Sequence, residues 1–239
     1  MSPNTPSQRR LRPTERARLV LLVSVTLTVA LYVVPYGQYL AYPLMLLSTL
    51  AHEMGHGIAA LLVGGSFHRF QMWPDGSGVA VWSGSVGPIG HAVVAAGGLV
   101  GPAVAAAVGF AVGRTVRGAR GALIGVSVIL LLALLLVVRN PFGLIFVSVV
   151  LAGCVLAVRK ASGEVAQLVL IFLAVQLALS VFSRGDYLFT PVAQTSAGTM
   201  PSDVGQIAEA LFFPYWFWGA ICGAISVAVL LYGIKAYWR

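Results

Sequence analysis

Charged residues are scarce in this 239-residue sequence: they make up only 9% of it, whereas 59% of the residues are hydrophobic. Soluble globular domains carry about 25% charged residues, so the composition excludes an ordinary water-soluble enzyme. The mean hydropathy of +0.91 is typical of a helical membrane protein, whose outward faces meet lipid. A chain of this length has room for one membrane-embedded bundle, and we expect no separate soluble domain.

Cysteine is rarer still: Cys154 and Cys222 are the only two, and both lie inside apolar runs. This spacing excludes a disulfide framework and a CxxC motif, and we interpret both as buried packing residues. Acidic residues are few as well, and the net charge is +8. Because the basic residues flank the apolar runs, they predict contact with the headgroups of a lipid bilayer and no nucleic acid partner.

Apolar runs divide the chain, and each is close to the ~20 residues that cross ~30 Å of hydrocarbon as a helix. They cover residues 18–34, 42–64, 92–113, 121–138, 141–158, 164–182 and 213–234. We therefore predict an all-α polytopic membrane protein with six or seven transmembrane helices and a small β-hairpin insertion. Residues 1–17 are polar and basic and are expected to be disordered, so that residues 18–239 form a single membrane-embedded domain.

The first apolar run follows a basic segment, as the apolar part of a signal peptide does. A Pro-Tyr-Gly turn comes after it, with no convincing small-residue cleavage site. We interpret this run as a retained span, and its basic flank favours a cytoplasmic N-terminus.

Two stretches, 65–90 and 183–212, interrupt the helical pattern, and the first contains a hairpin signal at 66–83. Alternating side chains, a Pro-Asp-Gly-Ser-Gly turn and a Val-Ala-Val-Trp run predict two antiparallel strands. A free strand edge could hold an extended substrate through main-chain hydrogen bonds. The alternative is an amphipathic hairpin that Trp73 and Trp82 anchor at the membrane interface.

The most informative stretch is Ala-His-Glu-Met-Gly-His-Gly at residues 51–57. On a helix, His52 and His56 lie on one face. Two imidazoles at this spacing can ligate one zinc ion, and Glu53 can reach a water on that ion. Ionisable groups at membrane depth are costly and point to function. The motif therefore predicts a zinc hydrolase, with a metal-free polar packing cluster as the alternative.

Catalytic zinc commonly has three protein ligands and one open position, so a third ligand is expected elsewhere. Asp186 follows Arg184-Gly185 in a loop, and Asp203 lies in a Pro-Ser-Asp sequence where it could cap a helix. The residues by themselves do not choose between these two aspartates. The remaining candidates are His68, His91, Asp75, Glu164, Glu209, Cys154 and Cys222.

Asn140 precedes Pro141 between two apolar runs. A simple turn is one interpretation. The other is a substrate-binding role, in which the amide orients the substrate or polarises its carbonyl group.

These blocks resemble the site-2-protease family of intramembrane zinc metalloproteases, in particular its small bacterial members without a PDZ domain. The resemblance covers most of residues 45–225. It rests on the His-Glu-Met-Gly-His block, the Pro-Asp-Gly-Ser-Gly turn, Gly-Gly-Leu-Val-Gly-Pro at 97–102, Arg-Asn-Pro-Phe-Gly at 139–143 and Pro-Ser-Asp at 201–203. It implies zinc, a multi-pass protein of the bacterial plasma membrane, and cleavage of transmembrane or membrane-proximal segments of a substrate protein.

The resemblance also implies an aspartate ligand from a later helix. In better-known members this aspartate lies in an Asp-Gly pair, which the late spans of this chain lack. In the small bacterial subgroup a Ser-Asp pair precedes the last span, and this favours Asp203 over Asp186.

The sequence thus predicts a zinc metalloendopeptidase with His52, His56 and Asp203 as ligands and Glu53 as the catalytic base. The alternative is a zinc-binding membrane protein without peptidase activity, such as a transporter or an inactive scaffold. A transporter should carry several ionisable groups along a path through its spans. Outside the motif, the apolar runs contain almost none.

Overall fold

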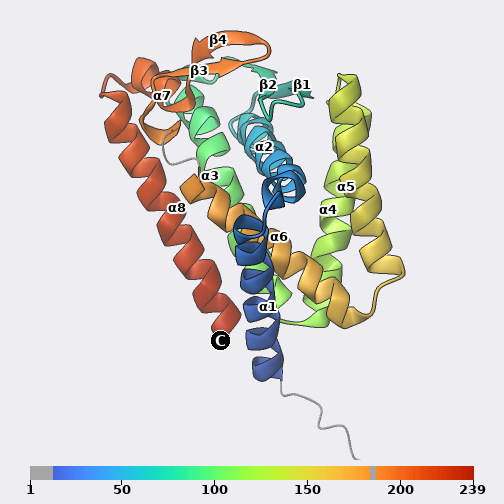
Figure 1. The fold of residues 1–239 in the computed structure, drawn as a ribbon. Helices are drawn as coiled ribbons and strands as arrows, with labels where there is room; N and C mark the ends of the chain where they lie inside the picture. Colours follow the sequence, from blue (N-terminus) through green and yellow to red (C-terminus); the bar gives the residue numbers. More distant parts are fainter. Residues whose placement is uncertain (1–12, 184–186) are drawn as a thin grey trace, which may run out of the picture.

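A computed structural model of the chain describes residues 13–183 and 187–239 (Figure 1). Long helices make up most of it, and one of them covers each predicted apolar run. The helices are α1 (Pro13–Val33), α2 (Gly37–Leu62), α3 (Gly87–Gly113), α4 (Val116–Leu136), α5 (Pro141–Arg159), α6 (Gly163–Ser183), α7 (Asp203–Leu211) and α8 (Tyr215–Trp238), with a short 3-10 helix, η1 (Tyr187–Phe189). The strands are β1 (Ser66–Met72), β2 (Gly78–Ser83), β3 (Val192–Thr195) and β4 (Gly198–Pro201).

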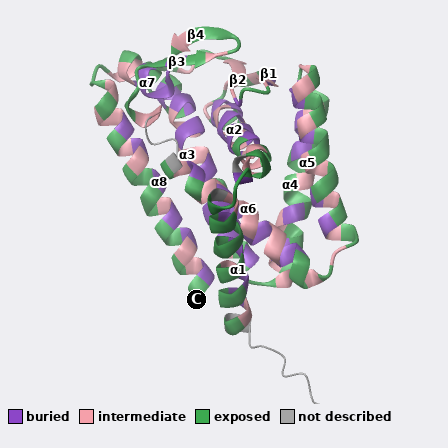
Figure 2. Cartoon of the chain, viewed as in Figure 1, coloured by how far each residue is buried: buried purple, intermediate pink, exposed green. Residues whose placement is uncertain are grey.

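Five of the described helices are long and apolar enough to cross a membrane, namely α3, α4, α5, α6 and α8. The other two long helices are α1 and α2. Many residues on the outward faces of the helices are exposed (Figure 2). Large apolar side chains are among the exposed residues, for example Leu135, Ile145 and Leu231. Soluble monomers rarely expose so much apolar surface, whereas lipid accommodates it. The prediction of an all-α polytopic membrane protein is confirmed.

Helix α1 begins at Pro13, before the predicted first span. Proline is favoured in the first turn because its missing N–H has no partner within the helix there. Glu15 in the same turn meets the positive end of the helix dipole. Residues 13–17, which we expected to be disordered, are therefore helical, and residues 1–12 lie outside the described part of the chain.

Helix α3 lies centrally in the bundle and contacts α2, α6, α7 and α8 (Figure 1). Small residues in its first half allow the backbone of α2 to approach closely. A Cβ atom added to Gly55 on α2 would lie 2.2 Å from the carbonyl oxygen of Gly97 on α3. This backbone contact fixes the two helices against each other, and α2 carries both histidines of the zinc motif.

Both hairpins and α7 gather at one end of the helices (Figure 1). β1 pairs antiparallel with β2, which confirms the predicted hairpin, and a bulge shifts the register between Phe67 and Arg69. Thr49 on α2 donates a hydrogen bond to the carbonyl oxygen of Gly76 at 2.7 Å and so ties the hairpin tip to α2.

The second hairpin, β3–β4, lies in the polar stretch 183–212, where we predicted no strand. Each of its strands has only four residues, and one ends at a proline. Such segments are too short to show the alternation that predicts a strand.

Residues 137–140 run along the outer edge of β1. The N–H of Phe70 donates to the carbonyl oxygen of Val137 at 2.7 Å, and the N–H of Arg139 donates to that of Phe70 at 3.0 Å. The Asn140 side chain continues this pairing, since its amide bonds both the N–H and the carbonyl oxygen of Met72, at 3.2 and 2.6 Å. The outer edge of β1 is thus covered, whereas the outer edge of β2 has no main-chain partner among the described residues.

Candidate metal centre

Three side chains of the predicted metal site meet below the two hairpins. Nε2 of His52 lies 3.2 Å from Nε2 of His56. The carboxylate of Asp203 reaches both rings, with Oδ2 at 3.1 Å from His52 Nε2 and Oδ1 at 3.3 Å from His56 Nε2. The side chains of the three residues are exposed by only 5–12%. Two histidines four positions apart on α2 and an aspartate about 150 positions later therefore meet at one buried point.

The donor set fits a tetrahedral metal ion. Zinc–ligand bonds of ~2.0–2.1 Å at tetrahedral angles place neighbouring ligand atoms ~3.3 Å apart, which is close to the distances between these three side chains. Oδ2 of Asp203 is buried, yet it accepts no hydrogen bond from the described residues. Facing lone pairs without protons between them repel each other unless a cation lies among them. The three side chains could therefore hold a metal ion with one position open.

The glycines of α3 make room for His56. A Cβ atom at Gly98 would lie 2.2 Å from Nε2 of His56, the nitrogen that faces Asp203. The other ring nitrogen, Nδ1, lies 2.8 Å from the carbonyl oxygen of Val94 and can donate a hydrogen bond to it. This partner fixes the tautomer with a lone pair on Nε2, as is usual for histidines that bind metals.

Helix α7 brings Asp203 to the histidines. Ser202 is its N-cap and accepts a hydrogen bond from the N–H of Gly205 at 3.1 Å. The possibility that Asp203 itself caps the helix is therefore wrong: the cap is Ser202, which leaves the aspartate carboxylate available to the rings. Val204 and Ile207 of the same helix are buried in a cluster with residues of α3 and α8. This packing holds α7, and with it Asp203, in place.

Glu53 lines a pocket together with His52, His56 and Asp203 and exposes only 6% of its surface. β2 forms one wall of this pocket and the β3–β4 hairpin contributes the other. A Cβ atom at Gly78 would lie 2.7 Å from Cγ and 3.0 Å from Oε1 of Glu53. The glutamate carboxylate therefore lies between the three candidate ligands and the start of β2, where only glycine leaves space for it.

The tips of the two hairpins are hydrogen-bonded to each other beside this pocket. Oγ of Ser196 donates to Oδ2 of Asp75 at 2.6 Å, and the N–H of Ser196 donates to Oγ of Ser77 at 3.2 Å. Ser77 also donates to Oδ1 of Asp75 from its N–H and its hydroxyl. These hydrogen bonds, first of all the one from Ser196, lower the pKa of Asp75 below its ordinary value. We call this contact the hairpin clasp.

No other candidate for a third ligand among the described residues joins the three converging side chains. His68 contacts Ser83 at 2.6 Å, and the ring of His91 packs against Trp82 at 4.9 Å. Glu164 forms an ion pair with Arg16 at 3.1 Å. Asp75 belongs to the hairpin clasp, Glu209 is exposed, and Cys154 and Cys222 are buried in apolar clusters. Asp186, the rival of Asp203, lies outside the described residues.

Asn140 is not among the residues that line the Glu53 pocket in the described part of the chain. Both ends of its amide are occupied by the main chain of Met72. Its contacts give it a part in holding β1, and direct substrate binding stays a prediction. The turn interpretation of the sequence agrees with its position at the N-cap of α5.

The family model described as Peptidase M50B-like matches residues 22–233. The match includes the zinc motif, both hairpins and α7. No curated protein and no solved structure matches the chain.

Proposed function

The chain belongs to the Peptidase M50B-like family, and we propose that it is an intramembrane zinc metalloprotease that cleaves transmembrane or membrane-proximal segments of a substrate protein. The observation that carries the proposal is the buried triangle of two imidazoles and one carboxylate, with the Glu53 carboxylate beside it. The apolar outer surface is compatible with a multi-pass protein, and we assign it to a bacterial plasma membrane.

His52, His56 and Asp203 would hold the zinc ion. When bound, zinc would polarise the scissile carbonyl group and lower the pKa of a water molecule. The three residues leave one tetrahedral position for that chemistry, and their burial keeps bulk water away. Both imidazoles project from one helix, α2, and the close contact of α2 with α3 places Val94 against His56, which favours a preorganised site.

Glu53 would act as the general base. Its carboxylate is next to the candidate ligands and next to β2, so it can take a proton from the attacking water and pass it to the leaving amine. Gly78 keeps this position open, because any larger side chain there would push the carboxylate away.

The outer edge of β2 is the candidate binding surface for the substrate. A helical peptide has its backbone groups occupied by intrahelical hydrogen bonds, so it must unwind before its peptide bond can be attacked. An unwound segment could pair with β2 as an added strand, since residues 137–140 cover the other edge of this sheet. Val79 and Ala80 of β2 line the Glu53 pocket, and such a strand would pass directly beside the glutamate.

The decisive variant is Glu53→Gln, which keeps the size of the side chain and removes the base. We expect purified Glu53→Gln to bind about one zinc ion per chain and to cleave no membrane substrate. His56→Ala and Asp203→Ala should lose the zinc, and Glu209→Ala, an exposed acidic residue of the same helix α7, is the matched control. Metal content by elemental analysis and cleavage of a reconstituted transmembrane substrate are the two readouts.

The possible results distinguish a protease from a zinc-binding membrane protein without peptidase activity and from a metal-free packing cluster. If Glu53→Gln retains full cleavage, Glu53 is not the base. If the wild type binds zinc and cleaves no transmembrane substrate from a broad panel, the chain is a zinc-binding membrane protein without peptidase activity. If the wild type binds no zinc in the absence of chelators, the three side chains form only a packing cluster.

A further inference from the structure

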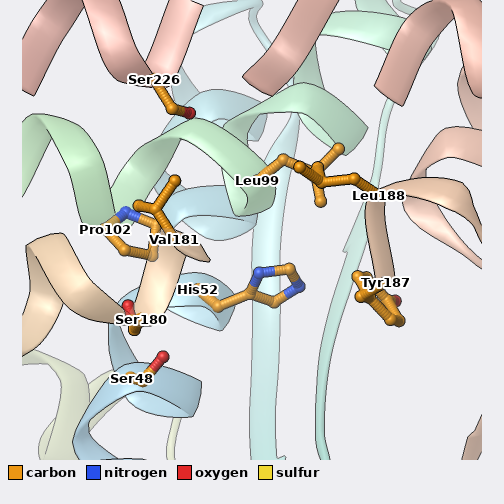
Figure 3. Close-up of a pocket in the computed structure, with 9 residues that line it drawn as sticks. All are labelled: Ser48, His52, Leu99, Pro102, Ser180, Val181, Tyr187, Leu188 and Ser226. Atoms are coloured by element: carbon orange, nitrogen blue, oxygen red, sulfur yellow. The ribbon is translucent and has the colours of Figure 1, made fainter. Parts of the chain in front are cut away.

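A second, smaller cavity lies on the other side of His52. His52 and Tyr187 line both this cavity and the Glu53 pocket, so the imidazole separates the two. Three serines from three helices share the cavity: Ser48 on α2, Ser180 on α6 and Ser226 on α8. In Figure 3 these serines lie on one side of the His52 ring and Tyr187 lies on the other.

Two of these hydroxyls have no hydrogen-bond partner among the described residues. They belong to Ser48 and Ser226, which expose only 4% and 1% of their surface. Ser180 donates to the carbonyl oxygen of Leu177 at 2.7 Å. The cavity is thus lined by hydroxyl groups from three helices.

The volume of the cavity indicates the size of that ligand. It is about 30 Å³, and a water molecule needs ~10–15 Å³ measured in this way, with two to four polar partners. The rest of the lining is apolar: Leu99, Pro102, Val181 and Leu188. No carboxylate of the described residues lines it, which argues against a cation, because hard cations take several oxygen ligands and favour carboxylates.

His52 supplies the last polar group. Its Nε2 faces Asp203 and His56, whereas its Nδ1 has no hydrogen-bond partner among the described residues. His56, in contrast, has Val94 as the partner of its Nδ1. Metal-binding histidines almost always donate this second N–H to a carboxylate, a carbonyl oxygen or a water molecule. The cavity is where such a partner for His52 can be accommodated.

We propose that the serine cavity is a water site that orients His52. Water in the cavity accepts a hydrogen bond from Nδ1–H of His52. The hydroxyls of Ser48 and Ser226 bind this water or a second water beside it, since the volume of about 30 Å³ admits two. The water at Nδ1 holds the ring in the tautomer that presents the Nε2 lone pair to the metal, as Val94 does for His56. Ser48 and Ser226 are then positioning residues. The inference rests on the proposed function, because it requires that His52 binds zinc.

The test uses full-length protein in detergent. Ser48→Ala and Ser226→Ala each remove one partner of the water, and Ser226→Val also fills the space that the water occupies. Ser127→Ala is the matched control, because Ser127 is a helical serine on α4 that donates to its own helix, at Leu123, and lies outside the cavity. Zinc affinity is measured by competition with a chromophoric chelator, and ligand geometry by the visible spectrum of the Co²⁺-loaded protein.

We expect Ser226→Val to weaken zinc binding about 10- to 100-fold, the usual loss when the partner of a metal-binding histidine is removed. Its Co²⁺ spectrum should change too, which a general loss of stability would not cause. Ser48→Ala and Ser226→Ala should show smaller losses in the same direction, and Ser127→Ala none.

A dry apolar cavity would behave in the opposite way. Filling it with the methyl groups of Ser226→Val would then raise the stability or leave it unchanged, with wild-type zinc affinity and Co²⁺ spectrum, and that result overturns the water site. If Ser226→Val does not fold, the two alanine variants decide, and wild-type zinc affinity in both also overturns it. Wild-type protein that binds no zinc would instead refute the proposed function.

Discussion

Gly98→Ala should damage the metal site by moving one of its candidate ligands. The added Cβ would lie 2.2 Å from Nε2 of His56, whereas ordinary van der Waals contact begins at 3.4 Å, so the ring or the helix must shift by about 1.2 Å. Metal–ligand distances in good sites hold to about ±0.2 Å. A displacement several times larger should weaken zinc binding by at least roughly 100-fold, the upper end of what the loss of an indirect partner causes.

Comparison with Gly97→Ala distinguishes displacement of the His56 ring from weaker packing of α2 against α3. The Cβ added at Gly97 would meet Cβ of Ala59 at 2.5 Å and the carbonyl oxygen of Gly55 at 2.7 Å, so it disturbs the same contact between α2 and α3 without touching the His56 ring. Gly125→Ala on α4 is the neutral control, because its Cβ would meet nothing within 4 Å. That variant should stabilise its helix by about 0.5–1 kcal/mol.

The assay is zinc competition in detergent, with the thermal unfolding midpoint of each variant measured in parallel. We expect Gly97→Ala to lose stability and Gly98→Ala to lose zinc affinity beyond any loss of stability. Wild-type zinc affinity in Gly98→Ala would refute the reasoning. Equal losses of affinity in Gly97→Ala and Gly98→Ala at equal stability would show that helix packing, and not the His56 ring, controls the site.

Two further predictions concern the hairpins. Asn140→Ala leaves the N–H and the carbonyl oxygen of Met72 without their side-chain partner, which should cost about 1–3 kcal/mol for each group. Hydrogen exchange at β1 should therefore be faster in Asn140→Ala. The increase should be smaller in Asn140→Asp, which keeps the hydrogen-bond acceptor. Unchanged exchange in Asn140→Ala would contradict the proposal that Asn140 holds β1 in place. The pKa of Asp75 is lowered in the folded protein, so the hairpin clasp contributes stability above the ordinary pKa of aspartate and loses it as the pH falls through the lowered value. Hydrogen exchange at β3–β4 should therefore increase on acidification in the wild type. In Ser196→Ala it should already be faster at neutral pH. If the exchange profile of Ser196→Ala is identical to that of the wild type, the clasp does not restrain the hairpin.

Local periodicity determined most of the fold. Apolar runs long enough to cross a membrane can only be helices there, because lipid offers no partners to backbone groups, and each run is helical in the structure. The same logic predicted the proximity of His52 and His56, since residues four apart share a helix face. The β1–β2 hairpin was visible too, because its strands are long enough to alternate and its turn contains glycine.

Contacts between distant segments could not be predicted in this way. The covering of β1 by residues 137–140 depends on where α4 ends and α5 begins beside the hairpin. The clasp between Asp75 and Ser196 joins two turns that lie 121 residues apart. The sequence placed Asp75 in a turn and left Asn140 either a turn or a substrate-binding role, and nothing in their immediate neighbours indicated the contacts that their side chains make.

The sequence by itself determined the class of protein, the zinc motif and the chemistry that the motif can support, since these follow from composition and helical spacing. It did not choose between Asp186 and Asp203 from the residues alone, because a candidate ligand at a distance of about 150 residues has no local signature. Only the tertiary structure decided that Asp203 meets the two histidines, that Gly98 leaves room for the His56 ring, and that three serines from three helices line a cavity beside His52. Each of these depends on the packing of α3 against its neighbours, which brings together side chains that no local pattern connects.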